Sequence, residues 1–335
     1  MLTPVEYIAL PDHVGSGGFD HAAVHGATGQ VYVAHTANDA VEIIDLAAGR
    51  HLFSIPGLAG VAGVLVSEEL PLVITSNRAE NTIAMFAPGP QPAIVKVAVG
   101  IRPNGLACDP KRGLILAANV GDPALPGSCT LSMVEIGERR LLAAIPVPGR
   151  TRWAIYDPDS EMFYVNIAEP AQIVVVAARD PRRVLRAFDV PAAGPHGLDL
   201  DLAAHRLYCA CDAKALVTLD AASGRILARQ KLSGVPDVVF FNARRQRLYV
   251  AIGDPGVIDV FDTSRLEARE TVATENGAHT LAFSPANDRV LAFMPGSCRA
   301  GVYEERNEDE RDAAQSRNRD RAPGQPTEPP RRTAL

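Results

Sequence analysis

The feature that most constrains this chain is a short pattern of strands that returns along nearly its whole length. The clearest copy contains the apolar strands Gln30-Val-Tyr-Val-Ala34 and Val41-Glu-Ile-Ile-Asp-Leu46, the turn Ala48-Gly49-Arg50, and a third strand from Leu52 to Ile55. Gly, Pro, Asn and Asp separate the strands, and no long segment keeps a helical period. The pattern therefore predicts an all-β chain.

The same order of strands returns further along, with another apolar strand before each unit. Arg206-Leu-Tyr-Cys-Ala210 is followed by Ala215-Leu-Val-Thr-Leu-Asp220, and Gly197-Leu-Asp-Leu-Asp201 precedes both. Weaker copies contain Leu72-Val-Ile-Thr-Ser76, Gly113-Leu-Ile-Leu-Ala117 and Met162-Phe-Tyr-Val-Asn166. Each unit thus has four strands, which is the composition of a β-propeller blade.

The number of blades follows from the length of the repeating part. Residues 1–303 accommodate seven units of the ~40–45 residues typical of propeller blades. The last unit, which ends at Ala300-Gly-Val-Tyr303, is one strand short, and Val5-Glu-Tyr-Ile-Ala-Leu10 precedes the first complete unit. We therefore predict a seven-bladed β-propeller whose N-terminal strand completes the last blade and leaves no free sheet edge.

Residues 304–335 differ from this repeating part in composition. Acidic residues alternate with Arg, and the Pro-rich stretch Ala322-Pro-Gly-Gln-Pro-Thr-Glu-Pro-Pro330 follows without an aliphatic cluster. Such a segment buries too little apolar surface to offset the entropy of ordering it. We expect a disordered, charged tail, which is either a solvated end or a short docking segment.

The repeat also carries a resemblance to a known family. Tyr32-Val-Ala, Tyr164-Val-Asn and Tyr208-Cys-Ala, with the Ile-Asp-Leu-type strands and X-Gly-Arg turns that follow such tripeptides, resemble the YVTN-repeat seven-bladed β-propellers. These are distantly similar to propeller lactonases, although no copy here reads Tyr-Val-Thr-Asn. The resemblance implies a fold, and the function has to be argued from the site because one fold hosts many activities.

Composition excludes some partners. The chain has 33 Lys and Arg against 39 Asp and Glu, a net charge of -6, and no basic cluster of the kind that binds nucleic acid. The N-terminus lacks the features of a secretory signal, and no apolar run approaches the ~18 residues of a membrane span. We expect a cytoplasmic protein without a membrane partner, and five cysteines do not suggest a disulfide framework.

Candidate functional residues come from the innermost strand of each blade, because these strands line the central channel and begin at its mouth. Alignment of the units places one residue of each blade there: His21, Val61 or Ala62, Asn104, Arg152, His196, Asp237 and His279. A slip of one residue would replace Arg152 with Trp153 and reverse the face of each side chain.

Four of these residues have the chemistry of metal ligands. His21, His196, Asp237 and His279 come from consecutive blades, and three imidazoles with a carboxylate suit a divalent transition metal that keeps an open position. Asn104 and Arg152, across the channel, would hold an anionic or carbonyl-bearing ligand. His35 is a further candidate ligand contact. The alternative is that these are hydrated polar residues of a wet channel.

Three functions remain open at this point, the third being a carrier that binds a ligand at the same mouth without a reaction. The first is a small-molecule site at the channel mouth, with metal-assisted hydrolysis or elimination as the similarity to propeller lactonases implies. The second is a non-catalytic scaffold that presents its loops to a protein partner. The sequence contains no phosphate loop, nucleophile elbow, HExxH or dinucleotide fingerprint, and it does not decide whether the chain is an enzyme.

Overall fold

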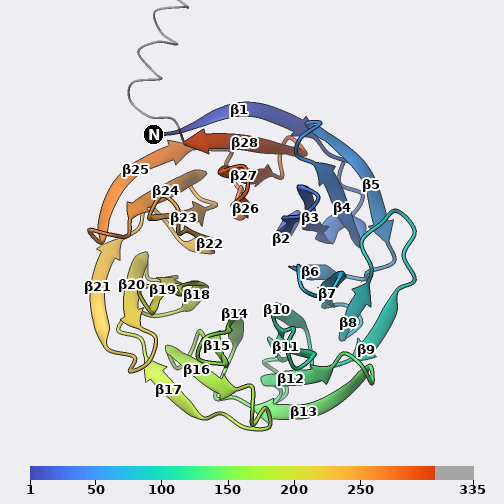
Figure 1. Cartoon of the computed structure of the whole chain (residues 1–335), viewed down its shortest axis with the longest axis vertical. Coiled ribbons are helices and arrows are strands. Elements are labelled where there is room, and N and C mark those ends of the chain that lie inside the picture. The colour runs from blue at the N-terminus through green and yellow to red at the C-terminus, as the bar shows by residue number, and fades with distance from the viewer. Residues whose placement is uncertain (306–335) are drawn as a thin grey trace, which may run out of the picture.

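The computed structural model describes residues 1–305, which form a closed ring of seven four-stranded antiparallel sheets (Figure 1). This confirms the all-β, seven-bladed propeller. In this part of the chain the only helix is the short 3-10 turn η1 (Thr36–Asn38). The strands of each blade run in sequence order from the channel outward, except in the blade that contains both ends of the ring.

The blades are numbered here in chain order. Blade 1 contains β2 (Phe19–His25), β3 (Gln30–His35), β4 (Ala40–Asp45) and β5 (Arg50–Pro56), and blade 2 contains β6 (Val61–Ser67), β7 (Leu72–Asn77), β8 (Thr82–Phe86) and β9 (Val95–Ala98). Blade 3 contains β10 (Pro103–Asp109), β11 (Leu114–Asn119), β12 (Thr130–Glu135) and β13 (Arg140–Pro146), and blade 4 contains β14 (Thr151–Asp157), β15 (Met162–Ile167), β16 (Gln172–Ala177) and β17 (Arg186–Asp189).

The remaining blades follow the same plan. Blade 5 contains β18 (Pro195–Asp201), β19 (Arg206–Cys211), β20 (Ala215–Asp220) and β21 (Ile226–Lys231), and blade 6 contains β22 (Pro236–Asn242), β23 (Arg247–Ile252), β24 (Val257–Asp262) and β25 (Glu267–Ala273). Blade 7 contains β26 (Thr280–Ser284), β27 (Arg289–Met294) and β28 (Arg299–Glu305), with β1 (Leu2–Ala9) as its outermost strand.

The pairing of β1 with β28 closes the ring, as the sequence predicted. The two strands are antiparallel, with Leu2 opposite Glu305 and Ile8 opposite Ala300. Strand β28 continues two residues beyond the expected boundary at residue 303, because Glu304 and Glu305 still pair with β1. The predicted disorder and docking role of the tail concern residues 306–335, which lie outside the described part of the chain.

Local turn chemistry explains why the blades have regular outer ends. After β4, the carboxylate of Asp45 accepts a hydrogen bond from the backbone N–H of Ala47 at 3.0 Å, and Gly49 has a φ of 61°. Blade 5 repeats this turn with Asp220 and with Gly224, whose φ is 73°. Glycine takes this left-handed conformation without strain, so the Asp-x-x-x-Gly spacing sets the turn between third and fourth strands.

The hydrophobic core lies between neighbouring blades. A tyrosine at the third position of the second strand is at most 1% exposed in four blades, where it is Tyr32, Tyr164, Tyr208 and Tyr249. Each ring packs among apolar side chains of the following blade, and the Tyr164 hydroxyl donates to the carbonyl oxygen of Ala221 at 3.0 Å. A blade therefore buries its apolar faces only against its neighbours.

Glycines let the innermost strands approach each other. A Cβ atom on Gly63, Gly105 or Gly197 would lie 2.2–2.4 Å from a carbonyl oxygen of the next blade. For Gly197 this oxygen belongs to Asp237. Any larger residue would separate the strands, so these glycines fix how close the channel-lining residues of adjacent blades lie.

Candidate functional site

Strand register identifies which residue of each blade begins the channel lining. In blade 5, Pro195 pairs with Cys211 and Leu198 with Cys209, which places His196 directly after the first pair. In blade 1 the corresponding pairs are Phe19 with His35 and Ala22 with Val33. The blade 1 equivalent of His196 is therefore Asp20, and His21 lies one residue further along its strand. This corrects the expected alignment of three histidines.

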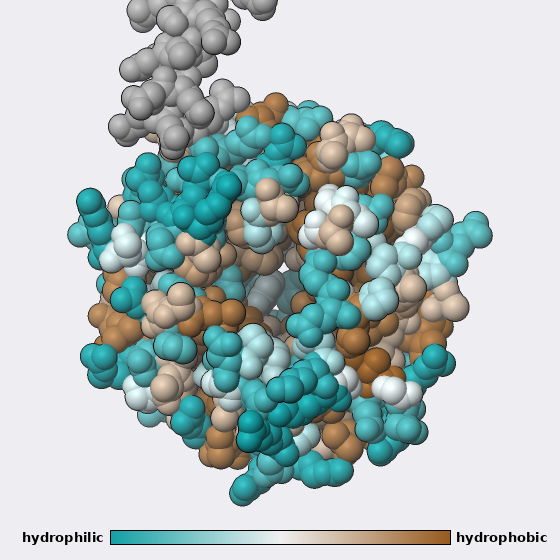
Figure 2. Space-filling model, viewed as in Figure 1, coloured by the Kyte–Doolittle hydropathy of each residue, from teal (hydrophilic) through white to brown (hydrophobic). Residues whose placement is uncertain are grey.

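We call the seven equivalent residues the mouth ring. The inner strands that carry it surround an opening at the centre of the molecule (Figure 2). The register selects Ala62 over Val61 in blade 2 and Arg152 over Trp153 in blade 4. The mouth ring consists of Asp20, Ala62, Asn104, Arg152, His196, Asp237 and His279.

An arginine from a loop bridges the two members of the mouth ring on either side of Ala62, the smallest member. Arg78, the first residue after β7, places Nη1 3.0 Å from Asp20 Oδ2 and donates from Nη2 to Asn104 Oδ1 at 2.6 Å. The two partners belong to blades 1 and 3. The methyl side chain of Ala62, in the blade between them, leaves room for this guanidinium.

A second set of polar contacts lies on the other side of the mouth ring. Arg152 Nη1 lies 2.9 Å from His196 Nε2, and Arg152 Nη2 donates to Asp212 Oδ2 at 3.2 Å. His196 donates from Nδ1 to Asp212 Oδ1 at 2.8 Å. The oxygens of Asp237 lie 3.2 Å from His196 Nε2 and 4.0 Å from His279 Nε2. The structure thus brings together His196, Asp237 and His279.

Sequence reasoning missed Asp20, Arg78 and Asp212 as members of this site. Arg78 and Asp212 directly follow second strands, where they read as ordinary turn residues. The available signal was positional, because second strands end on the face where inner strands begin. Backbone hydrogen bonds from Arg78 N to Gly60 O and from Asp212 N to Gly194 O hold both residues there.

Opposing influences act on the pKa of His196. Burial opposes its charge, but Asp237 and Asp212 outweigh burial and raise the pKa of His196 to about 9. Burial likewise opposes ionisation of Asp237, and the charge of His196 overcomes it and holds the pKa of Asp237 well below its usual range. The two groups therefore favour each other's charged form, while Arg152, whose Nη1 lies 2.9 Å from Nε2 of His196 and can only donate, favours the neutral imidazole.

His21 lies beside this pair but in a different environment. The residue is 6% exposed, and its ring lies 4.2 Å, centroid to centroid, from the indole of Trp153. Burial lowers the pKa of His21, which keeps the imidazole neutral despite the nearby carboxylates of Asp20 and Asp237. The contact joins blade 1 to blade 4 across the channel.

Two exposed arginines extend the cationic side of the mouth. Arg102 and Arg150 occupy equivalent loop positions, since their carbonyl oxygens accept hydrogen bonds from Val120 N at 3.0 Å and Ala168 N at 2.8 Å. Burial and the charges of Arg152, Arg102 and Arg78 lower the pKa of Arg150. Within residues 1–305 no carboxylate pairs with Arg102 or Arg150. We call Arg78, Arg102, Arg150 and Arg152 the arginine cluster.

The expected metal ligands do not form a ready cation site. Across residues 1–305, no group of three or more His, Cys, Asp or Glu side chains is arranged to hold a metal ion. The guanidinium of Arg152 lies against Nε2 of His196, the atom that would bind the metal. The ring of His21 packs against the indole of Trp153.

His35 is not brought together with the channel residues. Its side chain is fully buried inside blade 1, where Nδ1 lies 2.8 Å from Glu42 Oε1 and Nε2 lies 2.7 Å from His13 Nδ1. Both ring nitrogens are therefore engaged by other side chains of the protein.

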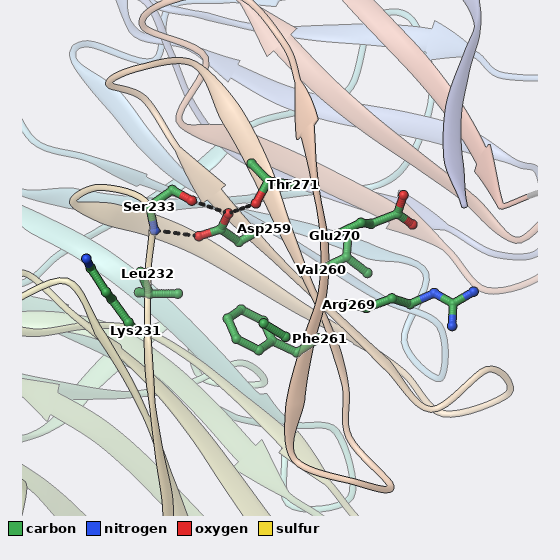
Figure 3. A pocket seen from close by; sticks show the side chains of 10 residues that line it. Lys231, Leu232, Ser233, Asp259, Val260, Phe261, Arg269, Glu270 and Thr271 are labelled. Atoms are coloured by element: carbon green, nitrogen blue, oxygen red, sulfur yellow. Dashed lines mark hydrogen bonds between the residues drawn. The ribbon is translucent and has the colours of Figure 1, made fainter.

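A surface groove of about 570 Å³ lies away from the mouth, between the outer strands of blades 5 and 6 (Figure 3). Its buried carboxylate, Asp259, accepts hydrogen bonds from the backbone and hydroxyl of Ser233, both at 2.7 Å, and from the hydroxyl of Thr271 at 2.8 Å. These contacts join the end of blade 5 to blade 6. We assign the groove a structural role, because these polar groups form hydrogen bonds with one another.

Comparisons with known proteins bear on the fold. No protein-family model matches the sequence, and no curated protein matches it. Among solved structures, a chain of "Kuenenia stuttgartiensis Hydrazine Synthase" aligns with a TM-score of 0.76 at 12% identity, covering 88% of this chain and 97% of that chain. At this identity the likeness shows the fold alone.

The chain is therefore a seven-bladed β-propeller with a cluster of mostly polar and charged side chains at one end of its channel. The finer resemblance to YVTN-repeat propellers gains no support from a family model. Over residues 1–305, no helix has the length and apolarity needed to cross a membrane.

Proposed function

We propose that the channel mouth binds a small anionic molecule, such as a carboxylate or a phosphate ester. The observation that carries this proposal is the arginine cluster, in which Arg102 and Arg150 are exposed and form no ion pair with any carboxylate in residues 1–305. Guanidinium groups bind planar oxyanions through paired hydrogen bonds, and their mutual repulsion is relieved when an anion enters.

The mouth ring adds to this recognition. The imidazolium of His196 contributes a further positive charge, and Asn104 contributes a polar amide beside Arg78. The Nε of Arg152 is buried without a hydrogen-bond acceptor. A ligand oxygen that draws this guanidinium toward the opening would give the atom a partner and lower the free energy of the bound state.

Thermal stability in the presence of simple anions tests the proposal. Inorganic phosphate and citrate are the probes, each compared with NaCl at the same ionic strength to remove screening effects. We expect a rise in melting temperature that saturates with probe concentration, since ligands of the folded state stabilise it by mass action. In Arg102→Gln/Arg150→Gln the probe affinity should fall about tenfold or more.

Arg183→Gln is the matched control, because Arg183 is exposed on the outer part of blade 4 and pairs only with Asp180 in the residues described. Its probe affinity should equal that of the wild type. The proposal is wrong if neither probe stabilises the protein beyond NaCl, or if the double variant responds as the wild type does.

A divalent transition metal at His21, His196, Asp237 and His279, acting in hydrolysis or elimination, is the second candidate. It is favoured by the carboxylate of Asp237, whose oxygens face Nε2 of both His196 and His279. Binding would require Arg152 to leave His196 and His196 to lose a proton. No contact in the described residues favours the protein-scaffold alternative over either ligand.

Elemental analysis of the purified protein tests the metal candidate. A stoichiometric transition metal in the wild type that is lost in His196→Ala would support it. Absence of metal from both samples, after incubation with zinc and removal of excess ion, would rule out this site.

A further inference from the structure

A hydrogen-bonded series of polar side chains crosses blade 1 without contributing to the mouth ring. His13 Nε2 lies 2.8 Å from the carbonyl oxygen of Pro295, and His13 Nδ1 lies 2.7 Å from His35 Nε2. His35 Nδ1 lies 2.8 Å from Glu42 Oε1. His35 and Glu42 are fully buried, and the ring of Phe19 lies 4.6 Å from that of His35. This hydrogen-bonded series therefore links blade 7 to the interior of blade 1.

The number of protons in the hydrogen-bonded series follows from the groups at its two ends, both of which accept hydrogen bonds. The carbonyl oxygen of Pro295 can only accept a hydrogen bond, so His13 Nε2 must carry a proton. Glu42 also accepts, and therefore His35 Nδ1 must carry one. The contact between the two imidazoles requires a third N–H, whereas two neutral imidazoles supply two in all. Satisfying all three contacts takes one proton more than two neutral rings hold.

The surroundings of Glu42 support its role as the balancing charge. Its second oxygen lies 2.9 Å from His51 Nε2 and accepts a hydrogen bond from the Ser54 hydroxyl. Burial opposes ionisation, but the hydrogen bonds and charges of His35, Ser54 and His51 outweigh it and lower the pKa of Glu42. A carboxylate with a buried imidazolium partner is thus electrically balanced inside the blade.

We propose that His13 and His35 share one additional proton, and that this proton latches the segment of residues 11–18 across the closure between blade 7 and blade 1. The segment is otherwise held by few bonds, including Val14 N to Asn38 Oδ1 at 2.8 Å and Gly15 N to Ala37 O at 2.9 Å. Loss of the proton leaves one of the three contacts in the chain without its hydrogen.

The pH dependence follows from this count. The titratable groups that face the two imidazoles are Glu42 on β4 and, through Glu42, His51 on β5. On the blade 7 side, the loop that carries Pro295 is held by Glu275, which accepts hydrogen bonds from Gly296 N and Ser297 N. With Glu42 ionised throughout, the latch is closed at low pH and opens as pH rises.

Two measurements on the full chain test the latch. In protein with ¹⁵N-labelled histidine, nuclear magnetic resonance should show one charged ring shared between His13 and His35 near pH 6. Amide hydrogen exchange of residues 12–18, corrected for intrinsic rates, should accelerate by about tenfold more than in the neighbouring strands between about pH 5 and about pH 8.

His13→Asn removes the shared proton, and we expect fast exchange of residues 12–18 at every pH. His205→Asn is the matched control, because His205 is exposed in a turn with a φ of 51°, a conformation that Asn accepts readily. This control should behave as the wild type. Neutral rings at both His13 and His35 near pH 6, or exchange that does not depend on pH in the wild type, would overturn the proposal. The wild-type series decides even if His13→Asn does not fold.

Discussion

At the scale of single residues, position in the channel determines ionisation. His196 and His21 are both histidines of inner strands, yet two carboxylates raise the pKa of His196 to about 9 while burial lowers that of His21. Asp199, three residues along the strand from His196, shows the reverse case for an acid. Burial raises its pKa to about 7, against the two backbone N–H groups of Leu200 and Phe241 that favour its charged form.

Asp199→Asn tests this argument through the pH dependence of stability. An acid whose pKa rises on folding contributes stability that is present at low pH and is lost as pH rises, here between about pH 4 and about pH 7. We expect the variant to match the wild type near pH 4 and to exceed it by about 1–2 kcal/mol near pH 8. Urea unfolding at both pH values measures the difference.

The control for Asp199→Asn is Asp159→Asn, because Asp159 is an exposed residue in a turn of blade 4. It should change stability by less than about 0.5 kcal/mol at either pH. A wild type that is equally stable near pH 4 and pH 8 relative to Asp199→Asn would contradict the raised pKa.

At the scale of elements, β1 is the strand on which the closed ring depends. It supplies the outer edge of blade 7, and Ile8 is 2% exposed in a core that includes Val31 and Val33 of blade 1. Tyr7, the next residue on the opposite face, is 53% exposed. Tyr7 and Ile8 thus lie on opposite faces of β1, and the side chain of Ile8 packs against blade 1.

Ile8→Ala should therefore lower the free energy of unfolding by about 2–4 kcal/mol, because it leaves a cavity in the core at the closure. Tyr7→Ala should cost much less, although the guanidinium of Arg299 lies over its ring. Removal of residues 1–10 should expose the edge of β28 and destabilise all blades. Thermal melting of the three variants compares them, and equal losses for Ile8→Ala and Tyr7→Ala would refute the argument.

At the scale of the whole molecule, the ring should unfold as a unit. Every core cluster contains residues of two neighbouring blades, and the closed ring has no terminal repeat from which unfolding could start. The chain has one tryptophan, Trp153, which lies in the channel between blades 1 and 4. Its fluorescence therefore reports on the interior of the ring.

We expect the urea transition measured by Trp153 fluorescence to coincide with that measured by far-ultraviolet circular dichroism. A variant with Trp153→Phe should retain one transition by circular dichroism, which controls for effects on the tryptophan alone. Fluorescence that changes at clearly lower urea than the strand signal would show that the channel opens before the blades unfold.

The sequence by itself determined the repeat, the number of blades and the N-terminal strand that closes them. Strand periodicity, turn residues and unit length are local properties. Residues such as Tyr32, Asp45 and Gly49 show them within a short stretch of sequence. For the same reason the repeat alone indicates that inner strands begin at five polar residues of the mouth ring, Asn104, Arg152, His196, Asp237 and His279.

Only the tertiary structure decided which side chains meet. Asp20 lies beside Arg78, and His21 lies against Trp153, because of the register in which the strands pair. A shift of one residue in that register reverses the face of a side chain. Likewise, the contact between His13 and Pro295 joins residues far apart in the chain, so no local pattern announces it. Charge, burial and hydrogen bonding at the mouth are products of this convergence, because each blade contributes a single residue to the mouth ring.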